Sequence, residues 1–374
     1  MMSPAAGKNS LKARMRETVA GFCHELLHGK DAVRRDQAMS LLYETPEGKA
    51  LLDIAAEHGV PIRFMRAGKV GALGSLSKDP DDATVGISVA NTGNVPQMVL
   101  TLYHELRHLQ QQDEQGDIRK GVFQTLKNPR RSHMLSLMQE ADAFTSEAMF
   151  ALNRNAAGDK KYLDSMLSRG DDVARVSARY IKKAPVSYEQ DRDAFRRGLF
   201  TNIMLEGLAG YSASYFIGYA AVFRKAATRQ EFADFVENLG ELRKPDRQGP
   251  LISPYGESYM AQTAMTALPT IFFKALPHPE QEALRLIDKT VRALPQMTEE
   301  QYQKTREAAT DALLAIYRTD PEDLAYSFEG ITAREIVTEV ATAQTPNLRT
   351  AFAKVATRKL QPVRSIAVRA PVPR

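Results

Sequence analysis

Apolar residues between positions 95 and 112 recur at steps of three and four, which is the pattern of one buried helix face. The members of this stripe are Val99, Leu102, Leu106 and Leu109. Upstream, the residues from Asn91 to Asn94 include a glycine and side chains that can cap a helix, and Pro96 suits a first helical turn. The pattern predicts a helix that begins near residue 95 and buries the stripe.

Two β-strands are predicted immediately before this helix. Residues 84–89 alternate between apolar and small or polar types, with Val85, Ile87 and Val89 on one side, as expected of a half-buried strand. A second strand is predicted over 70–76, and residues 78–82 between the two have the composition of a turn. We therefore expect a hairpin that leads directly into the helix.

A second long helix is predicted over residues 132–152. Its apolar positions at helical steps are Met134, Leu137, Met138, Ala141, Phe144, Ala148 and Leu152. Glu140 falls beside this apolar face, where a carboxylate is costly unless it is paired or bound to a metal. A glutamate at the flank of the face, in a surface ion pair, is the alternative interpretation.

The remaining chain reads as successive helices separated by proline or glycine. Their expected ranges are 171–183, 189–224, 228–241, 256–275, 279–294, 298–318 and 332–343. Thr228 and Glu231 have the spacing of a capping box, and Thr298 stands at another helix start. The predicted fold class is α+β, mostly helical, with a small sheet and a helical C-terminal half.

Composition indicates an ordinary globular protein, because 43% of the 374 residues are hydrophobic and 25% are charged. The single cysteine, Cys23, excludes an intramolecular disulfide framework and a cysteine-ligated zinc site. No signal peptide or membrane span is expected, and a cytoplasmic location is predicted. The net charge of +5 is concentrated in a tail after Pro346 that has no acidic residue. This tail could bind an acidic partner or serve only as a solubilising terminus.

The residues with the clearest chemistry are His104, Glu105 and His108 in the first predicted helix. Histidines four apart lie on one helix face, so both imidazoles can bind one zinc ion. The glutamate between them can then act as general base toward the water that the ion activates.

The stretch from His104 to Gln111, followed by Gln139 to Phe144, resembles zincin metallopeptidases of the gluzincin type, including uncharacterised bacterial members. The resemblance covers roughly residues 60–155. It implies a Zn²⁺ cofactor, a third ligand from the following helix, and a last strand that forms the sheet edge on which a peptide is laid. Glu140 is the predicted third ligand. Asp142 could accept a hydrogen bond from a ligand histidine, and Glu147 is a reserve ligand.

The metzincin branch of the same group is disfavoured, because Gln111 and Glu114 stand where it would have glycine and histidine. The expected organisation is a helical segment at 1–55, a zincin-like catalytic core at 56–160, a helical subdomain at 161–345 and a basic, partly disordered tail at 346–374. The predicted function is a zinc-dependent metallopeptidase acting on a peptide or protein. The alternatives are a helical interaction protein and a degenerate metal-binding scaffold, either with the basic tail for an acidic partner.

Three tyrosines at four-residue spacing, Tyr211, Tyr215 and Tyr219, could help to stabilise an oxyanion or could line the core or a groove. None is assigned a catalytic role. A second copy of the histidine motif begins at His24, but Gly29 follows its last histidine and no strand precedes it. The prediction there is a structural histidine at a helix end.

Overall fold

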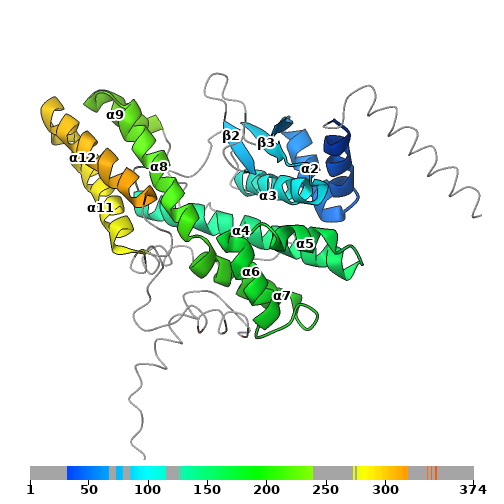
Figure 1. Ribbon diagram of the computed structural model, residues 1–374. Helices are drawn as coiled ribbons and strands as arrows, with labels where there is room; N and C mark the ends of the chain where they lie inside the picture. The colour runs from blue at the N-terminus through cyan, green and yellow to red at the C-terminus, as the bar shows by residue number, and fades with distance from the viewer. Residues whose placement is uncertain are drawn as a thin grey trace, which may run out of the picture. The chain divides into compact units, whose positions relative to one another are not determined.

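The computed structural model describes residues 32–66, 73–78, 85–114, 126, 128–238, 273 and 276–318, and positions 335, 338 and 342. The chain is a mostly helical α+β protein with a small mixed sheet, as predicted (Figure 1). It divides into a first unit, Met1–Val122 with Ser146–Arg169, and a second unit, Phe123–Thr145 with Gly170–Arg374. The continuous helix α4 (Pro129–Ala156) contributes residues to both units.

The sheet of the first unit consists of β1 (Ile62–Arg66), β2 (Gly74–Lys78) and β3 (Val85–Asn91), in the order β1-β3-β2. The antiparallel pairing of β2 with β3 confirms the predicted hairpin. The expectation that the last strand before the helix forms the sheet edge is wrong. A strand that was not predicted, β1, pairs in parallel with β3, so β3 is central and β2 is an edge of the described sheet.

Helix α3 (Val95–Glu114) packs on β2 and β3, with α2 (Pro46–Glu57) and α5 (Lys161–Leu167) against it. Its start at Val95 agrees with the prediction, because Oδ1 of Asn94 accepts a hydrogen bond from the Gln97 N–H at 3.3 Å. All four residues of the predicted stripe are fully buried. Because this face packs into the core, His104 and His108 lie on a different face of α3.

The second unit is helical throughout its described part. It contains α6 (Asp172–Lys183), α7 (Arg192–Asn202), the π-helix η2 (Ile203–Gly207), α8 (Ala209–Lys225), α9 (Arg229–Asn238), α11 (His278–Ala293), the 3₁₀ turn η3 (Leu294–Gln296) and α12 (Glu299–Tyr317). Capping boxes begin α9, through Thr228 and Glu231, and α12, through Thr298 and Gln301. Among the helices of the described ranges, none is long and apolar enough to cross a membrane.

The prediction of one helix over 189–224 is wrong in detail, because α7 and α8 are separated by η2 and by Leu208, whose φ and ψ are −107° and 12°. The helix η2 packs against α6, and a wider π turn changes the rotation of every residue that follows it. Several predicted features lie outside the described residues: the motif at His24, most of the helix at 256–275, and the tail from 346 onward.

Candidate metal centre

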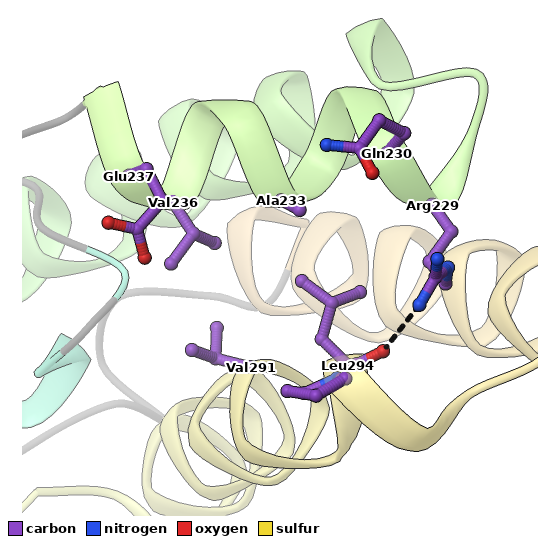
Figure 2. Close-up of a pocket in the computed structure, with 8 residues that line it drawn as sticks. Arg229, Gln230, Ala233, Val236, Glu237, Val291 and Leu294 are labelled. Carbon is purple, nitrogen blue, oxygen red and sulfur yellow. Dashed lines mark hydrogen bonds between the residues drawn. The ribbon is translucent and has the colours of Figure 1, made fainter.

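A pocket of about 490 Å³ lies in the second unit, between α9 and the end of α11 with η3 (Figure 2). Its floor is apolar, with Ala233, Val236, Val291 and Leu294, and its two ends carry Arg229 and Glu237. None of the predicted site residues lines it. The pocket is therefore separate from the chemistry that the sequence indicates.

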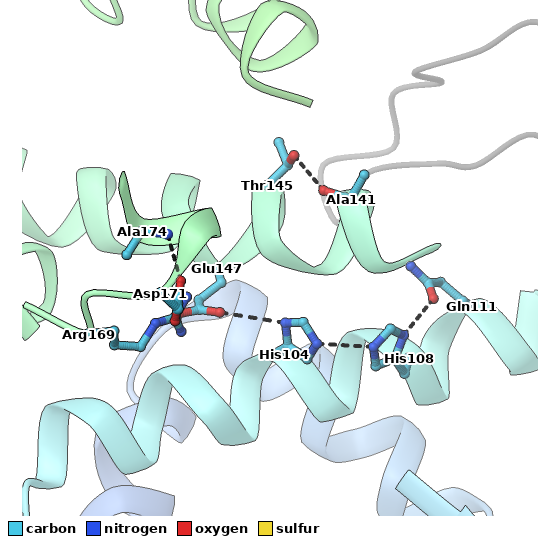
Figure 3. Close-up of polar contacts among 9 residues, drawn as sticks. All are labelled: His104, His108, Gln111, Ala141, Thr145, Glu147, Arg169, Asp171 and Ala174. Atoms are coloured by element: carbon cyan, nitrogen blue, oxygen red, sulfur yellow. Dashed lines mark hydrogen bonds and ion pairs between the residues drawn. The ribbon is translucent and has the colours of Figure 1, made fainter. Parts of the chain in front are cut away.

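The two motif histidines lie one turn apart on the same face of α3 and point their rings toward each other (Figure 3). The ring centroids are 4.7 Å apart and the planes meet at 83°. The two Nε2 atoms are 3.1 Å apart. Nitrogen ligands of a tetrahedral zinc ion, each at about 2.0–2.1 Å from the metal, are separated by about 3.3 Å, so this spacing fits a shared ion.

An oxygen atom lies near Nδ1 on the far side of each ring. Nδ1 of His108 lies 3.0 Å from Oε1 of Gln111, and Nδ1 of His104 lies 3.5 Å from Oε2 of Glu147 (Figure 3). An amide or carboxylate oxygen accepts hydrogen bonds, so these contacts favour the tautomer in which Nδ1 carries the proton and Nε2 keeps its lone pair. In that tautomer the two Nε2 lone pairs face each other, an arrangement that a cation stabilises.

Glu140 on α4 completes a group of three candidate ligands with His104 and His108. One ligand atom of each residue lies within 4.8 Å of the others. His104 is buried, while His108 and Glu140 are half-buried. Two imidazoles and one carboxylate are a donor set found in catalytic zinc sites, which keep a fourth position open. All three predicted ligands are therefore brought together.

Glu147, considered from sequence as a reserve ligand, faces Nδ1 of His104 instead of the Nε2 side. Its side chain is 1% exposed, and Nη1 of Arg169 donates a hydrogen bond to its other oxygen at 2.5 Å. The position of Glu147 beside Nδ1 is typical of a carboxylate that orients a metal-binding histidine. The sequence had suggested Asp142 for this role. Asp142 is fully buried on the same helix. Sequence reasoning missed Arg169 altogether.

The carboxylate of Glu105 lies against the backbone of β2. A methyl group placed on Gly74 would be 2.7 Å from Oε1 of Glu105 and 2.6 Å from Cγ2 of Thr101, too close for either to stay in place. Glycine at this strand position therefore makes room for the motif glutamate. A glycine inside a strand is a signal for close approach of another group, and it could have drawn attention to residue 74.

For the zinc hydrolase that the sequence predicts, Gly74→Ala is expected to lower peptide turnover by about tenfold to a hundredfold with zinc binding retained, because the added methyl displaces Glu105 while leaving the candidate ligands in place. The matched control is Gly86→Ala in β3, where the nearest atom to a new methyl would be 3.6 Å away on Pro61. Steady-state kinetics and zinc content of both variants provide the measurement. Equal turnover of the two variants would contradict the placement of Glu105.

Of the three tyrosines on α8, Tyr215 contacts a predicted site residue. Its hydroxyl donates a hydrogen bond to Oε1 of Glu140 at 2.9 Å. Tyr219 is buried, with its hydroxyl 3.5 Å from the carbonyl oxygen of Pro129, and the ring of Tyr211 packs edge-on against Phe144. Burial, and then the nearby Glu140 carboxylate, raise the pKa of Tyr215 well above its usual value. The Tyr215 hydroxyl is therefore the donor in its contact with Glu140.

Comparison of the chain with models of protein families, with curated proteins and with solved structures finds no match. The resemblance to gluzincins thus stays a prediction from short motifs. The functional assignment depends on the geometry of α3 and α4.

Proposed function

We propose that this protein is a zinc-dependent metallopeptidase, with His104, His108 and Glu140 as metal ligands and Glu105 as general base. The observation that carries the proposal is the pair of Nε2 atoms 3.1 Å apart, with each Nδ1 facing an oxygen acceptor. Such a pair is arranged for a cation before any cation arrives, which reduces the cost of organising the site. Glu140 supplies the negative charge that a divalent ion requires.

A bound zinc ion supplies Lewis acidity, which polarises the attacked carbonyl group and lowers the pKa of water toward about 7. Glu105 accepts the proton that water loses when its oxygen adds to the carbonyl carbon, and then gives this proton to the amine nitrogen as the C–N bond breaks. The 7% exposure of Glu105 keeps its carboxylate away from bulk water. Arg169 and Glu147 hold His104 in its orientation throughout.

A peptide substrate is favoured by the position of β2. This strand is at an edge of the described sheet, and Gly74 within it touches Glu105. An edge strand offers backbone N–H and C=O groups to an extended peptide, so a chain paired with β2 would run close to the general base. The edge that serves this purpose would thus be β2, whereas the sequence had suggested the last strand.

The purified, reconstituted protein is expected to contain one zinc ion per chain, because the three ligands form one site with an open position. His104→Ala and His108→Ala should each lose the metal. His58→Ala is the matched control, since His58 is partly exposed and pairs with Asp113 away from the three ligands. Elemental analysis of the four proteins is the measurement, and absence of stoichiometric metal in the wild type would refute the proposal.

Turnover of a mixture of unlabelled peptides, followed by mass spectrometry, separates a peptidase from the two alternatives. A metal-binding scaffold would hold zinc without cleaving any peptide, and a helical interaction protein would do neither. Cleavage that stops when the metal is chelated, and returns with added zinc, is the result that the proposal requires.

A further inference from the structure

Glu140 is contacted from α8 by a side chain that is not one of the proposed ligands. The Tyr215 hydroxyl lies 2.9 Å from Oε1 of Glu140, and both residues belong to the second unit. Tyr215 is half-buried, and a phenol hydroxyl is a hydrogen-bond donor at neutral pH. A hydrogen bond from a neutral hydroxyl restricts the rotation of a carboxylate and leaves its negative charge in place.

The position of Tyr215 on α8 is fixed by buried polar contacts one turn away. His133 of α4 packs edge-on against the Tyr215 ring, with centroids 6.0 Å apart. Nε2 of His133 lies 3.0 Å from the Ser212 hydroxyl, which donates a 2.6 Å hydrogen bond to Glu280 of α11. All three of these side chains are fully buried. These contacts fix the position of α8 along α4. They therefore also fix the direction in which the Tyr215 side chain points.

We propose that Tyr215 is a positioning residue for Glu140, which it holds in one orientation for binding the metal. The inference depends on the proposed metal site, and it assigns to Tyr215 a role in metal affinity, distinct from any contact with the substrate. A ligand carboxylate that is free to rotate must lose that freedom when the ion binds. The hydrogen bond restricts the carboxylate before the ion arrives, so less conformational entropy is lost on binding. Removal of the hydrogen bond should therefore weaken the binding of the ion.

The direct test compares Tyr215→Phe with Tyr219→Phe in the full-length protein. Both substitutions remove one hydroxyl from the same stripe of α8, but in the structure the Tyr219 hydroxyl faces the backbone at Pro129. Competition with a chromogenic chelator should show zinc affinity about tenfold to a hundredfold weaker for Tyr215→Phe and unchanged for Tyr219→Phe. Equal zinc affinities of wild type and Tyr215→Phe would overturn the proposal.

A spectroscopic signature tests the same role in the wild type and in the two variants. The chain has 13 tyrosines and no tryptophan, so its near-ultraviolet absorbance reports tyrosines. Zinc bound by Glu140 withdraws charge from the acceptor of the Tyr215 hydrogen bond, and a tyrosine difference spectrum should therefore grow with zinc up to one equivalent. It should persist in Tyr219→Phe and disappear in Tyr215→Phe. A wild type that binds zinc with no change in tyrosine absorbance would contradict the proposal.

A double-variant cycle with Glu140→Gln shows whether Tyr215 acts through the carboxylate. If it does, the double variant should bind zinc as weakly as Glu140→Gln alone, so the two losses are not additive. Fully additive losses would show that Tyr215 acts by another route and would overturn the proposal. A wild type that binds no zinc at all is a different result, because it removes the metal site itself.

Discussion

Glu105→Gln is expected to lower turnover by about two to four orders of magnitude while zinc stays bound at full occupancy. The amide has nearly the shape of the carboxylate, so packing against Gly74 is retained, but it cannot accept the proton that the reaction releases. The motif histidines keep their Nδ1 contacts with Gln111 and Glu147, which this substitution does not touch. Activity should therefore vanish without the metal leaving.

Glu140→Gln is compared with Glu105→Gln, because the two glutamates have different proposed roles, one as metal ligand and the other as general base. A neutral amide oxygen is a weaker metal ligand than a carboxylate oxygen, so zinc affinity and turnover should fall together. Titration of each variant with a zinc chelator, kinetics on one cleaved peptide and a circular dichroism spectrum provide the comparison. Loss of zinc in Glu105→Gln, or retention of both zinc and turnover in Glu140→Gln, would show the roles to be wrong. Asp142 and Glu147 would then be the next ligands to test.

The sequence predicted the parts of the fold that follow from local periodicity. The stripe Val99 to Leu109 and the alternation of Val85, Ile87 and Val89 are both found buried, and the start of α3 lies where Asn94 caps it. The pairing of the β-strands could not be predicted from local periodicity. Nothing in the short segment of β1 states which strand it joins, and this pairing is what moves β3 from the edge to the centre of the sheet.

The break between α7 and α8 shows a second limit of periodicity. Residues 192–225 contain no proline, so the apolar pattern continues across the π turn and Leu208 as if the helix were unbroken. What interrupts the helix is the packing of η2 against α6. Tertiary contacts therefore decide the rotation of α8, and thus which of its tyrosines reaches Glu140.

The three candidate ligands could be proposed from the sequence because their signals are local, whereas the contacts that support them could not. His104 and His108 are one turn apart, and Glu140 stood out as a carboxylate on an apolar helix face. Arg169 meets Glu147 from 22 residues along the chain, and Tyr215 meets Glu140 from 75 residues away. No local pattern joins these pairs, so the structure was needed to find them.

Glu280→Gln is expected to remove a pH dependence of stability that the wild type owes to one buried carboxyl group. Burial raises the pKa of Glu280 from 4.5 to about 7, with the hydrogen bond from Ser212 acting in the opposite direction. As pH rises from 4.5 to about 7, the carboxyl ionises in the unfolded chain before it ionises in the folded one. The wild type therefore loses roughly 3 kcal/mol of unfolding free energy over this window and no more above it.

The neighbouring histidine contributes with the opposite sign. Burial lowers the pKa of His133 from 6.5 to about 3, so the stability that the neutral imidazole provides is lost as pH falls through this range. Its Nε2 lies 3.9 Å from Oε2 of Glu280, with Ser212 between them. Because His133 is present in both proteins, its contribution largely cancels when the variant is subtracted from the wild type.

The measurement is urea unfolding of wild type and Glu280→Gln at about pH 4 and about pH 8, with zinc-free protein so that metal binding does not contribute. The amide cannot ionise, and it keeps an oxygen that accepts the Ser212 hydrogen bond. Relative to the wild type, the variant should thus gain about 3 kcal/mol between the two pH values. The control is Glu282→Gln on the same helix, where the carboxylate is 53% exposed and its ion pair with Arg285 contributes at most about 1 kcal/mol. Parallel stability curves for wild type and Glu280→Gln would show that burial does not raise the pKa of Glu280 in the folded protein.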